Sequence, residues 1–360
     1  MNAPHPTALL REQLYRDMNP LNLTPLWEVL HALVPLQPTS PCVPALWKYE
    51  EVRPFLMRAG EAITAEEAVR RVLILENPAL RGQSAITQSL YAGLQLILPG
   101  EVAPSHRHTQ SALRFIVEGS GAYTAVDGER TTMRPGDFII TPSWTWHDHG
   151  HEGRAFSDDS KAGEPVVWLD GLDIPMIRFF DAGFAENDTA KSQTVTRAEG
   201  TSYARYGYNM APVRHDAPFG GTSPIFSYPY ERSRDALERL ERDAPVDDWD
   251  GVKLRYLNPL TGGSPMPTMA TFMQKLPAGF SGKGWRQTDG AVYSVVEGDG
   301  RVAIEGDGRS FSFDLSPRDH FVVPSWHTAR LSSERGCVLF SYSDRPVHQA
   351  LGIHHEERLP

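Results

Sequence analysis

Four histidines in the first half of the sequence have the spacing of metal ligands on β-strands. His106 and His108 lie two positions apart, and so do His147 and His149. On a strand, this spacing places both imidazoles of a pair on one face. Imidazole binds iron, zinc, copper and nickel, and a few such ligands with open positions make a catalytic type of site. Surface or hydrogen-bonded histidine pairs show the same spacing, so the surrounding pattern has to decide.

Glycine and proline fall at set distances from these histidines. Five residues separate Gly100 from His106. Further along, five residues separate Gly136 from Pro142, and four more precede His147. This agreement favours a metal site formed by the first three of the four histidines. Which of these metals it binds stays open at this point.

Short strands are expected to carry these side chains. From about residue 86 the sequence alternates short apolar stretches with glycine turns, and Asp127-Gly128 is a hairpin signal. Regular short strands of this kind are typical of a β-sandwich or barrel. Residues 7–85 instead predict mostly helices, including one over 21–34 with Thr24 as N-cap and one over 62–72 with Thr64 as cap. Residues 233–242 predict a further amphipathic helix.

The strand-rich texture occurs twice, which indicates a duplicated domain rather than a short repeat. Residues Gly100, Glu118, Gly119 and Gly121 recur 179 positions later as Gly279, Glu297, Gly298 and Gly300. The tripeptide at 142–144 recurs 182 positions later at 324–326. The nearly shared offset makes chance similarity a poor explanation.

Composition excludes several function classes. A chain of 360 residues corresponds to about two domains. The net charge of −10 argues against a nucleic-acid binder, which needs a clustered basic surface, although a local basic pocket stays possible. Two distant cysteines, Cys42 and Cys337, cannot form a disulfide framework and indicate a reducing compartment. No signal-peptide pattern or spanning-length apolar run is visible, so a cytoplasmic protein without a membrane partner is expected.

The histidine pattern resembles the cupin family, whose members are jelly-roll barrels with one metal held by inward-facing strands. At the position of the family's glutamate ligand this sequence has Ala112. In the second copy the four ligand positions hold Trp285, Gln287, Ala291 and Ala329, so no metal is expected there. His320 and His327 are then expected to be structural. The remaining matched elements are Gly100, His106, His108, Gly119, Gly136, Pro142 and His147.

The resemblance implies a mainly β bicupin, with two jelly-roll β-barrels and a helical N-terminal region. The expected parts are a helical region at 1–85, a metal-binding barrel at 86–185, a linker with a helix at 186–250 and a metal-free barrel at 251–360.

Longer segments are similar to the gentisate 1,2-dioxygenases and to the salicylate and 1-hydroxy-2-naphthoate 1,2-dioxygenases of the same ring-cleaving group. They include RRVLILENPALRG, HRHTQSALRFIVEG, PGDFIITPSWTWHDHG and RYLNPLTGGSPMPT, and the similarity covers nearly the whole chain. It implies an Fe(II) enzyme of aromatic degradation that uses O2 to convert gentisate to maleylpyruvate, assembled as a homotetramer. The same chemistry on salicylate, substituted salicylates or 1-hydroxy-2-naphthoate is the alternative.

The resemblance also assigns the site. Its iron ligands fall on His106, His108 and His147. Its substrate residues fall on Arg70, Tyr91, Gly93, Gln95, Arg114, His149 and Asp170.

Residue chemistry suggests a role for each of these positions. The expected catalytic residues are Arg114, which would grip the carboxylate, and His149, which would act as hydrogen-bond donor or general acid–base. Arg70 is expected at the substrate or on the oxygen side. Tyr91 and Gln95, supported by Asp170, are expected at the 5-hydroxyl, and Gly93 is expected to leave room for the substrate plane. Outside the site, Trp144, Trp146 and Trp168 are expected to pack the barrel, and His151 is expected at the surface.

Two other functions stay open. A cupin isomerase or decarboxylase with manganese or zinc would more often keep the glutamate. A non-catalytic ligand-binding cupin, such as a sensor or a storage protein, would normally carry a DNA-binding motif or a signal peptide, and neither is visible.

Overall fold

The computed structural model describes residues 6–155, 158–214 and 220–360, and the chain divides into two units, residues 1–39 and 40–360. Residues 156–157 of the expected first barrel and 215–219 of the expected linker lie outside the described residues. The first unit contains α1 (Pro6–Met18), η1 (Asn19–Leu21) and α2 (Leu26–Leu33). The prediction of Thr24 as N-cap is wrong, because Pro25 has an extended backbone at ψ 120° and the helix starts only after it. In the described part of the chain, no helix is both long and apolar enough to cross a membrane.

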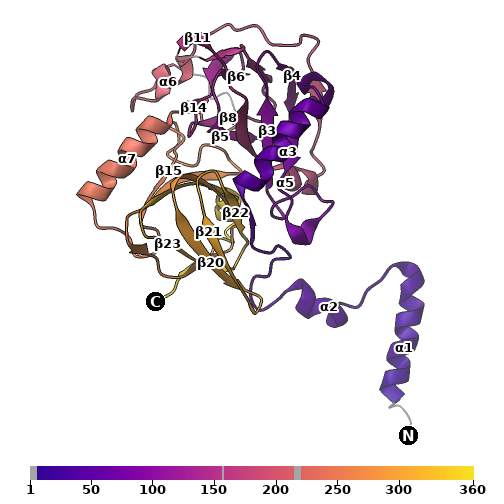
Figure 1. The fold of residues 1–360 in the computed structure, drawn as a ribbon. Coiled ribbons are helices and arrows are strands. Elements are labelled where there is room, and N and C mark those ends of the chain that lie inside the picture. The colour runs from indigo at the N-terminus through magenta and orange to yellow at the C-terminus, as the bar shows by residue number, and fades with distance from the viewer. Residues whose placement is uncertain (1–5, 156–157, 215–219) are drawn as a thin grey trace. The chain divides into compact units, whose positions relative to one another are not determined.

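The first half of the larger unit consists of two facing sheets (Figure 1). The strand orders are β14-β8-β5-β12-β3-β2 and β13-β4-β9-β6-β7, and β10 pairs with β11. The strands are β2 (Val72–Ile74), β3 (Tyr91–Ile97), β4 (Val102–His108), β5 (Ala112–Glu118), β6 (Ala122–Val126), β7 (Glu129–Thr132), β8 (Phe138–Thr141), β9 (His147–His151), β10 (Arg154–Ala155), β11 (Asp158–Ala162), β12 (Val166–Leu172), β13 (Ala185–Asn187) and β14 (Ser227–Tyr228).

The second half repeats this plan with the strand orders β1-β22-β19-β24-β16-β15 and β21-β20-β23-β18-β25, while β17 pairs with β23. The described chain is thus mainly β, and the predicted pair of jelly-roll barrels is confirmed. The strands are β1 (Ala45–Trp47), β15 (Val252–Arg255), β16 (Ala270–Leu276), β17 (Phe280–Ser281), β18 (Trp285–Gln287), β19 (Ala291–Gly298), β20 (Gly300–Gly306), β21 (Arg309–Leu315), β22 (His320–Val323), β23 (Thr328–Ser333), β24 (Cys337–Ser343) and β25 (Glu356–Arg358).

Helices connect these sheets. They are α3 (Tyr49–Ala62), α4 (Ala65–Ala68), η2 (Pro78–Leu80), α5 (Ile174–Phe179), α6 (Thr201–Tyr206), α7 (Tyr230–Asp243) and α8 (Arg345–Ala350). The helix predicted at 233–242 is confirmed as α7. The one predicted at 62–72 is shorter: Thr64 caps α4 as expected, by accepting from Glu67 N at 3.1 Å, but β2 begins at Val72. The hairpin at Asp127-Gly128 is confirmed, with φ of 48° and 76° between β6 and β7.

The two barrels share individual hydrogen bonds at equivalent positions. Asp173 follows β12 and Asp344 follows β24, and each carboxylate binds the backbone N–H just before its own barrel's β5 or β19. Each also accepts from a hydroxyl of the other barrel, so the pair ties the barrels together reciprocally. The partners are Ser111 N (2.9 Å) and Thr268 Oγ1 (2.6 Å) for Asp173, and Gly290 N (3.1 Å) and Ser89 Oγ (2.5 Å) for Asp344.

Two segments contact both barrels, because each has a strand that pairs in one barrel and a following helix that packs against the other. β1 pairs with β22 in the second barrel, whereas α3, which follows it, packs against β3 in the first. In the same way β14 pairs with β8 in the first barrel, whereas α7 packs against β15 and β16 in the second (Figure 1). The region expected to be helical, residues 1–85, therefore also contains two strands: β1 belongs to a sheet of the second barrel and β2 to a sheet of the first.

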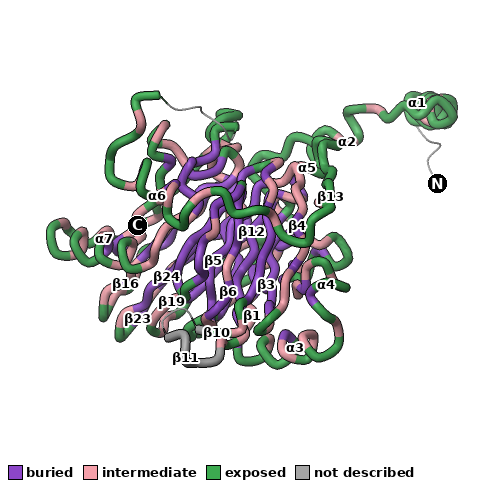
Figure 2. The backbone as a smooth tube through the Cα atoms, turned by 90° about the horizontal axis from the view of Figure 1, so that it is seen from above, coloured by how far each residue is buried: buried purple, intermediate pink, exposed green. Residues whose placement is uncertain are grey.

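The sheet that contains β3, β5 and β12 is buried on both faces (Figure 2). One face packs against the second barrel, where the rings of Phe115 and Phe340 stack at 4.2 Å. The other face lines the interior of the first barrel and includes Trp168 and Ile116. Each such buried side chain contributes roughly 1.5–3 kcal/mol of hydrophobic stabilisation. The strands that carry candidate site residues are therefore held from both sides.

Candidate metal centre and active site

Two adjacent antiparallel strands bring the predicted ligands together. β4 carries His106 and His108, and β9 carries His147 directly across from His106. Their ring centroids lie 4.5–5.3 Å apart. The ligand atoms of the three residues all lie within 4.8 Å of one another, and this is the one such group of three or more among the described residues. The predicted histidine cluster is therefore formed.

The protonation of these histidines suits a metal. The Nδ1 atoms of His108 and His147 contact the backbone oxygens of Gln110 at 2.9 Å and Thr145 at 3.0 Å, which leaves Nε2 free. Burial lowers the pKa of His108 to about 4 and that of His106 to about 2, and it also lowers the pKa of His147 well below its usual value. Neutral imidazole with a free Nε2 is the metal-binding form.

Ala112 stands where a glutamate ligand would lie in related barrels. It is the first residue of β5, is buried, and packs with Tyr91 and Leu172. The position therefore supplies a methyl group to a small apolar cluster and no charge to the histidines.

Arg114 lies inside the barrel on the same strand. Its guanidinium is 3.7 Å from Asp170 Oδ1, and its Nη1 donates to Thr141 Oγ1 at 2.5 Å. Asp170, which faces Arg114 in register on β12, also accepts from Trp168 Nε1 at 3.0 Å. Burial raises the pKa of Asp170 to about 6. Arg114 Nε, the atom nearest Asp170, makes no hydrogen bond to the described residues, because 3.7 Å is too long for one.

Arg70 reaches the histidines from outside the barrel strands. Its Nη1 donates to the backbone oxygens of Val69 at 2.8 Å and Pro104 at 3.0 Å, and its Nη2 is 3.3 Å from His106 Nε2. Burial, followed by the nearby charge of Arg114, lowers the pKa of Arg70 to about 9. Val69, the residue before Arg70, has a φ of 57°. This left-handed conformation is strained for a β-branched residue.

His149 is fully buried, and in the described structure neither ring nitrogen has a hydrogen-bond partner. Its ring lies 5.9 Å from that of His147 and 5.2 Å from that of Trp168 on the facing sheet. Burial lowers its pKa well below the usual value. A neutral imidazole with an unpaired donor and an unpaired acceptor is costly unless a ligand or water binds it.

Tyr91, Gly93 and Gln95 alternate along β3 and share the face that Asp170 and Trp168 present on β12. A Cβ on Gly93 would lie 2.5 Å from Val72 Cγ1 and 2.8 Å from Tyr91 Oη. The glycine therefore makes room for the tyrosine phenol, and room for a substrate plane at this point stays a prediction. Burial raises the pKa of Tyr91.

The sequence reasoning missed Thr141 and misplaced several neighbours of the site. A polar residue ending the apolar strand β8 was the only signal for Thr141. Trp168 is in the core, but Trp144 and Trp146 instead lie over the guanidinium of Arg107, at 4.5 and 4.6 Å. The surface position expected for His151 is wrong: the residue is 4% exposed, and its Nε2 lies 2.7 Å from Glu164 O, where it closes the end of β9.

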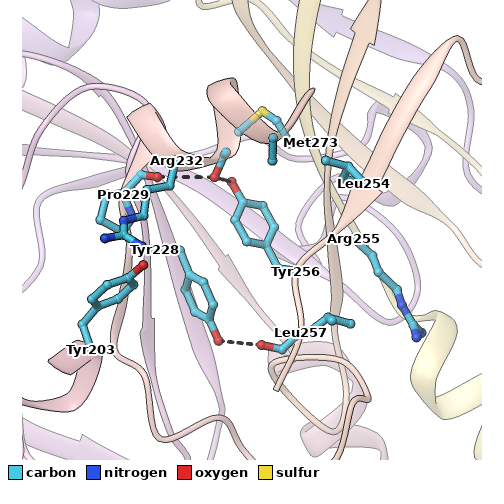
Figure 3. Close-up of a pocket in the computed structure, with 11 residues that line it drawn as sticks. Tyr203, Tyr228, Pro229, Arg232, Leu254, Arg255, Tyr256, Leu257 and Met273 are labelled. Carbon is cyan, nitrogen blue, oxygen red and sulfur yellow. Dashed lines mark hydrogen bonds between the residues drawn. The ribbon is translucent and has the colours of Figure 1, made fainter. Parts of the chain in front are cut away.

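A separate cavity of about 280 Å³ lies beside α7 and β15 (Figure 3). Tyrosine rings form much of its wall, and Tyr228 Oη donates to Leu257 O at 3.0 Å. None of the candidate site residues lines it.

Comparison with known proteins matches this geometry. A cupin-domain family model matches residues 93–156. The chain is 52% identical over 348 residues to gentisate 1,2 dioxygenase 1 of Aquipseudomonas alcaligenes, covering 97% of this chain and 96% of that protein. It is 36% identical over 320 residues to a 1-hydroxy-2-naphthoate 1,2-dioxygenase of Nocardioides sp. (strain KP7), covering 88% and 79%.

A solved structure extends the match to the fold. Salicylate 1,2-dioxygenase from Pseudoaminobacter salicylatoxidans, crystallised as an adduct with gentisate, aligns with a TM-score of 0.86 and 32% identity, covering 99% of this chain and 95% of that one. Sequence similarity along nearly the whole chain, the shared fold and the three-histidine site agree. This chain belongs to the gentisate 1,2-dioxygenase family of ring-cleaving bicupin dioxygenases.

Proposed function

We propose that this chain is an Fe(II)-dependent gentisate 1,2-dioxygenase, which opens the ring of 2,5-dihydroxybenzoate with O2 to give maleylpyruvate. One observation carries the proposal: a cluster of three neutral histidines in one barrel adjoins the buried Arg114, the half-buried Arg70 and a histidine whose ring has no partner in the described structure. This arrangement suits an anionic substrate that chelates a metal through its carboxylate and ortho-hydroxyl.

His106, His108 and His147 would hold the iron. Their donor set fits a divalent metal, because burial keeps the imidazoles neutral and two of the rings are fixed through Nδ1. Bound iron would supply electron transfer between the aromatic ring and O2. With alanine at position 112, the protein adds no negative charge to the metal, which favours an anionic substrate.

Arg114 would bind the substrate carboxylate. A guanidinium presents two parallel donors to a carboxylate and stays charged, and Asp170 and Thr141 hold this one in place. Arg70, whose Nη2 is 3.3 Å from His106 Nε2, would add positive charge where oxygen binds. Tyr91, Gly93 and Gln95 would face the ring, with the Tyr91 phenol placed for the 5-hydroxyl.

His149 would hold or move a proton at the substrate. Its imidazole is neutral and has one free donor and one free acceptor, so it can accept the proton of the chelating hydroxyl and later return it. Burial excludes bulk water from this exchange.

Anaerobic reconstitution with Fe(II), followed by addition of gentisate and air, tests the proposal. We expect O2 uptake equal to the gentisate consumed and a new ultraviolet absorbance from the ring-opened product. Turnover on gentisate, salicylate and 1-hydroxy-2-naphthoate should be measured side by side, because one or two contacts can shift the preference. Faster turnover of either analogue would reassign the substrate, and no O2 uptake with any of the three would refute the enzyme assignment.

Assembly as a homo-oligomer, a tetramer by family resemblance, also belongs to the proposal. η1 and α2 contain no buried residue, although α2 includes Leu26, Trp27, Leu30 and Leu33. Apolar side chains of this kind are commonly covered in an assembly. Light scattering coupled to size-exclusion chromatography tests the subunit number.

A further inference from the structure

A tyrosine of the metal-free barrel reaches into the strand that carries the substrate-facing residues. Tyr342 lies on β24, is fully buried, and donates its hydroxyl hydrogen to Tyr91 O at 2.8 Å. The two residues are 251 positions apart. Tyr91 is the first residue of β3, where the sheet hydrogen bonds begin, so this contact anchors the end of the strand.

The space for Tyr342 is provided by Gly171 on β12. A Cβ at this glycine would lie 2.7 Å from Tyr342 Cζ, which no side chain could accommodate without a shift. Gly171 precedes Asp173 by two positions, as Tyr342 precedes Asp344, so the two residues occupy equivalent places in the two barrels. The ring of Tyr342 therefore occupies the space that a side chain at position 171 would need.

This arrangement breaks the symmetry of the duplicated fold in one direction. Tyr342 of the second barrel donates a hydrogen bond to the first barrel. Gly171, the equivalent residue of the first barrel, has no side chain that could donate one to the second. Both strands that Tyr342 touches carry candidate site residues next to the contact: Tyr91 itself on β3, and Asp170 beside Gly171 on β12.

We propose that Tyr342 is a positioning residue, through which the metal-free barrel fixes Tyr91 and so the grip on the 5-hydroxyl of the substrate. The inference rests on the proposed function for its substrate. Tyr342 touches the backbone of Tyr91 and not the substrate, so its loss should change recognition of the 5-hydroxyl and leave the metal ligands in place.

Tyr342→Phe tests this, because it removes one hydroxyl and keeps the ring that fills the space over Gly171. Tyr256→Phe is the matched control: Tyr256 Oη also makes a hydrogen bond, to Ser233 Oγ at 2.9 Å, but it lies beside α7. The first readout is amide hydrogen exchange in peptides that cover β3, with no substrate present. We expect faster exchange there in Tyr342→Phe only, with unchanged iron content.

The second readout is substrate discrimination. In Tyr342→Phe the KM for gentisate should rise about two- to tenfold, the range expected for one lost buried hydrogen bond. The dissociation constant for salicylate, which has no 5-hydroxyl, should stay unchanged under anaerobic conditions. Unchanged exchange in β3 would overturn the proposal, and so would equal weakening for both compounds or an equal effect of the control. If the wild-type enzyme leaves gentisate untouched, the proposed function fails, and hydrogen exchange still decides whether Tyr342 holds this strand.

Discussion

The two barrels share a framework and differ in what fills it. In the first barrel β4 presents two imidazoles and β9 presents three, and the ring nitrogens of His149 have no hydrogen-bond partner in the described structure. In the second barrel other side chains occupy the equivalent positions, and two of them, Trp285 and Gln287, line a cavity of about 250 Å³. Trp285 and Ala329 are packed in its core, and Gln287 donates to Asp289 at 3.0 Å and accepts from Arg345.

The difference shows that turns and strand pairing are kept independently of chemistry. Both barrels retain the glycine turns, the buried alternation and the aspartate after the last strand, because these features specify the fold. Among the described residues, three histidines gather into one cluster in the first barrel alone. A fully buried histidine whose ring nitrogens have no hydrogen-bond partner in the described structure occurs in both barrels, as His149 in the first and His320 in the second. The second barrel contacts the first through apolar packing and through hydrogen bonds such as that of Tyr342 to Tyr91 O.

His147→Ala should have the largest effect, because it gives the first barrel the residue that the second has at Ala329. We expect iron content to fall close to zero and turnover to fall about a thousandfold or more, since the metal supplies several kcal/mol of transition-state stabilisation. Elemental analysis measures the iron content, and O2 uptake measures turnover. His327→Ala in the second barrel is the control and should keep both. Stoichiometric iron in His147→Ala would contradict the ligand assignment.

Arg114→Lys tests a position at which the two barrels differ, because the second barrel has Tyr293 at the equivalent place. Lysine keeps the charge but loses the two-pronged contact and the hydrogen bond to Thr141. We expect kcat/KM for gentisate to fall roughly 10- to 100-fold, the cost of a hydrogen bond to a charged group, with unchanged iron content. Arg301→Lys, at an exposed ion pair with Asp314, is the control. Equal kinetics in both variants would remove Arg114 from the substrate site.

Ala329→His asks whether one ligand can be restored to the second barrel. Ala329 is fully buried and faces Trp285 and Ile304 across neighbouring strands. An imidazole there is too large and has no partner, so the free energy of unfolding should fall by roughly 2–4 kcal/mol without added metal. Denaturant unfolding measures the loss. A stable variant that binds a second iron per chain would show that this barrel is closed only by its side chains.

Asp173→Asn should give the smallest effect and separates the two equivalent aspartates by pH. Burial raises the pKa of Asp173 to about 6, so its stabilising contribution is fully present below the unfolded pKa of about 4 and is lost as the pH rises to the folded value. Relative to Asp173→Asn, the wild-type protein should therefore lose roughly 1–3 kcal/mol of stability between about pH 4 and pH 7.

Asp344→Asn is the matched variant for this pH comparison. Asp344 also contacts His348 Nε2 at 3.2 Å, so its replacement should cost stability at neutral pH. Denaturant unfolding at several pH values distinguishes the two variants. If the free energies of unfolding of the wild-type protein and Asp173→Asn differ by the same amount at every pH, Asp173 does not have the raised pKa proposed for it.

Local patterns were enough to predict much of the fold and the ligand set. The distances from glycine and proline to the histidines predicted His106, His108 and His147. Strand alternation puts His106 and His108 on one face of β4, whereas His147 meets them because β9 pairs with β4. The same patterns misjudged Thr24 and His151, whose environments depend on a proline backbone and on a loop closing over β9. Thr141 was missed because a threonine at a strand end carries no sign of its arginine partner.

The sequence by itself determined the duplication, the turns and the three candidate ligands, since the repeat offset, the hairpin signals and the distances from glycine and proline to histidine can all be read along the chain. The tertiary structure decided which distant groups meet them: Arg70 beside His106, Thr141 and Asp170 around Arg114, and Tyr342 beneath Tyr91. These contacts join segments tens to hundreds of positions apart. They depend on how two sheets face each other and how two barrels pack, which no local spacing encodes.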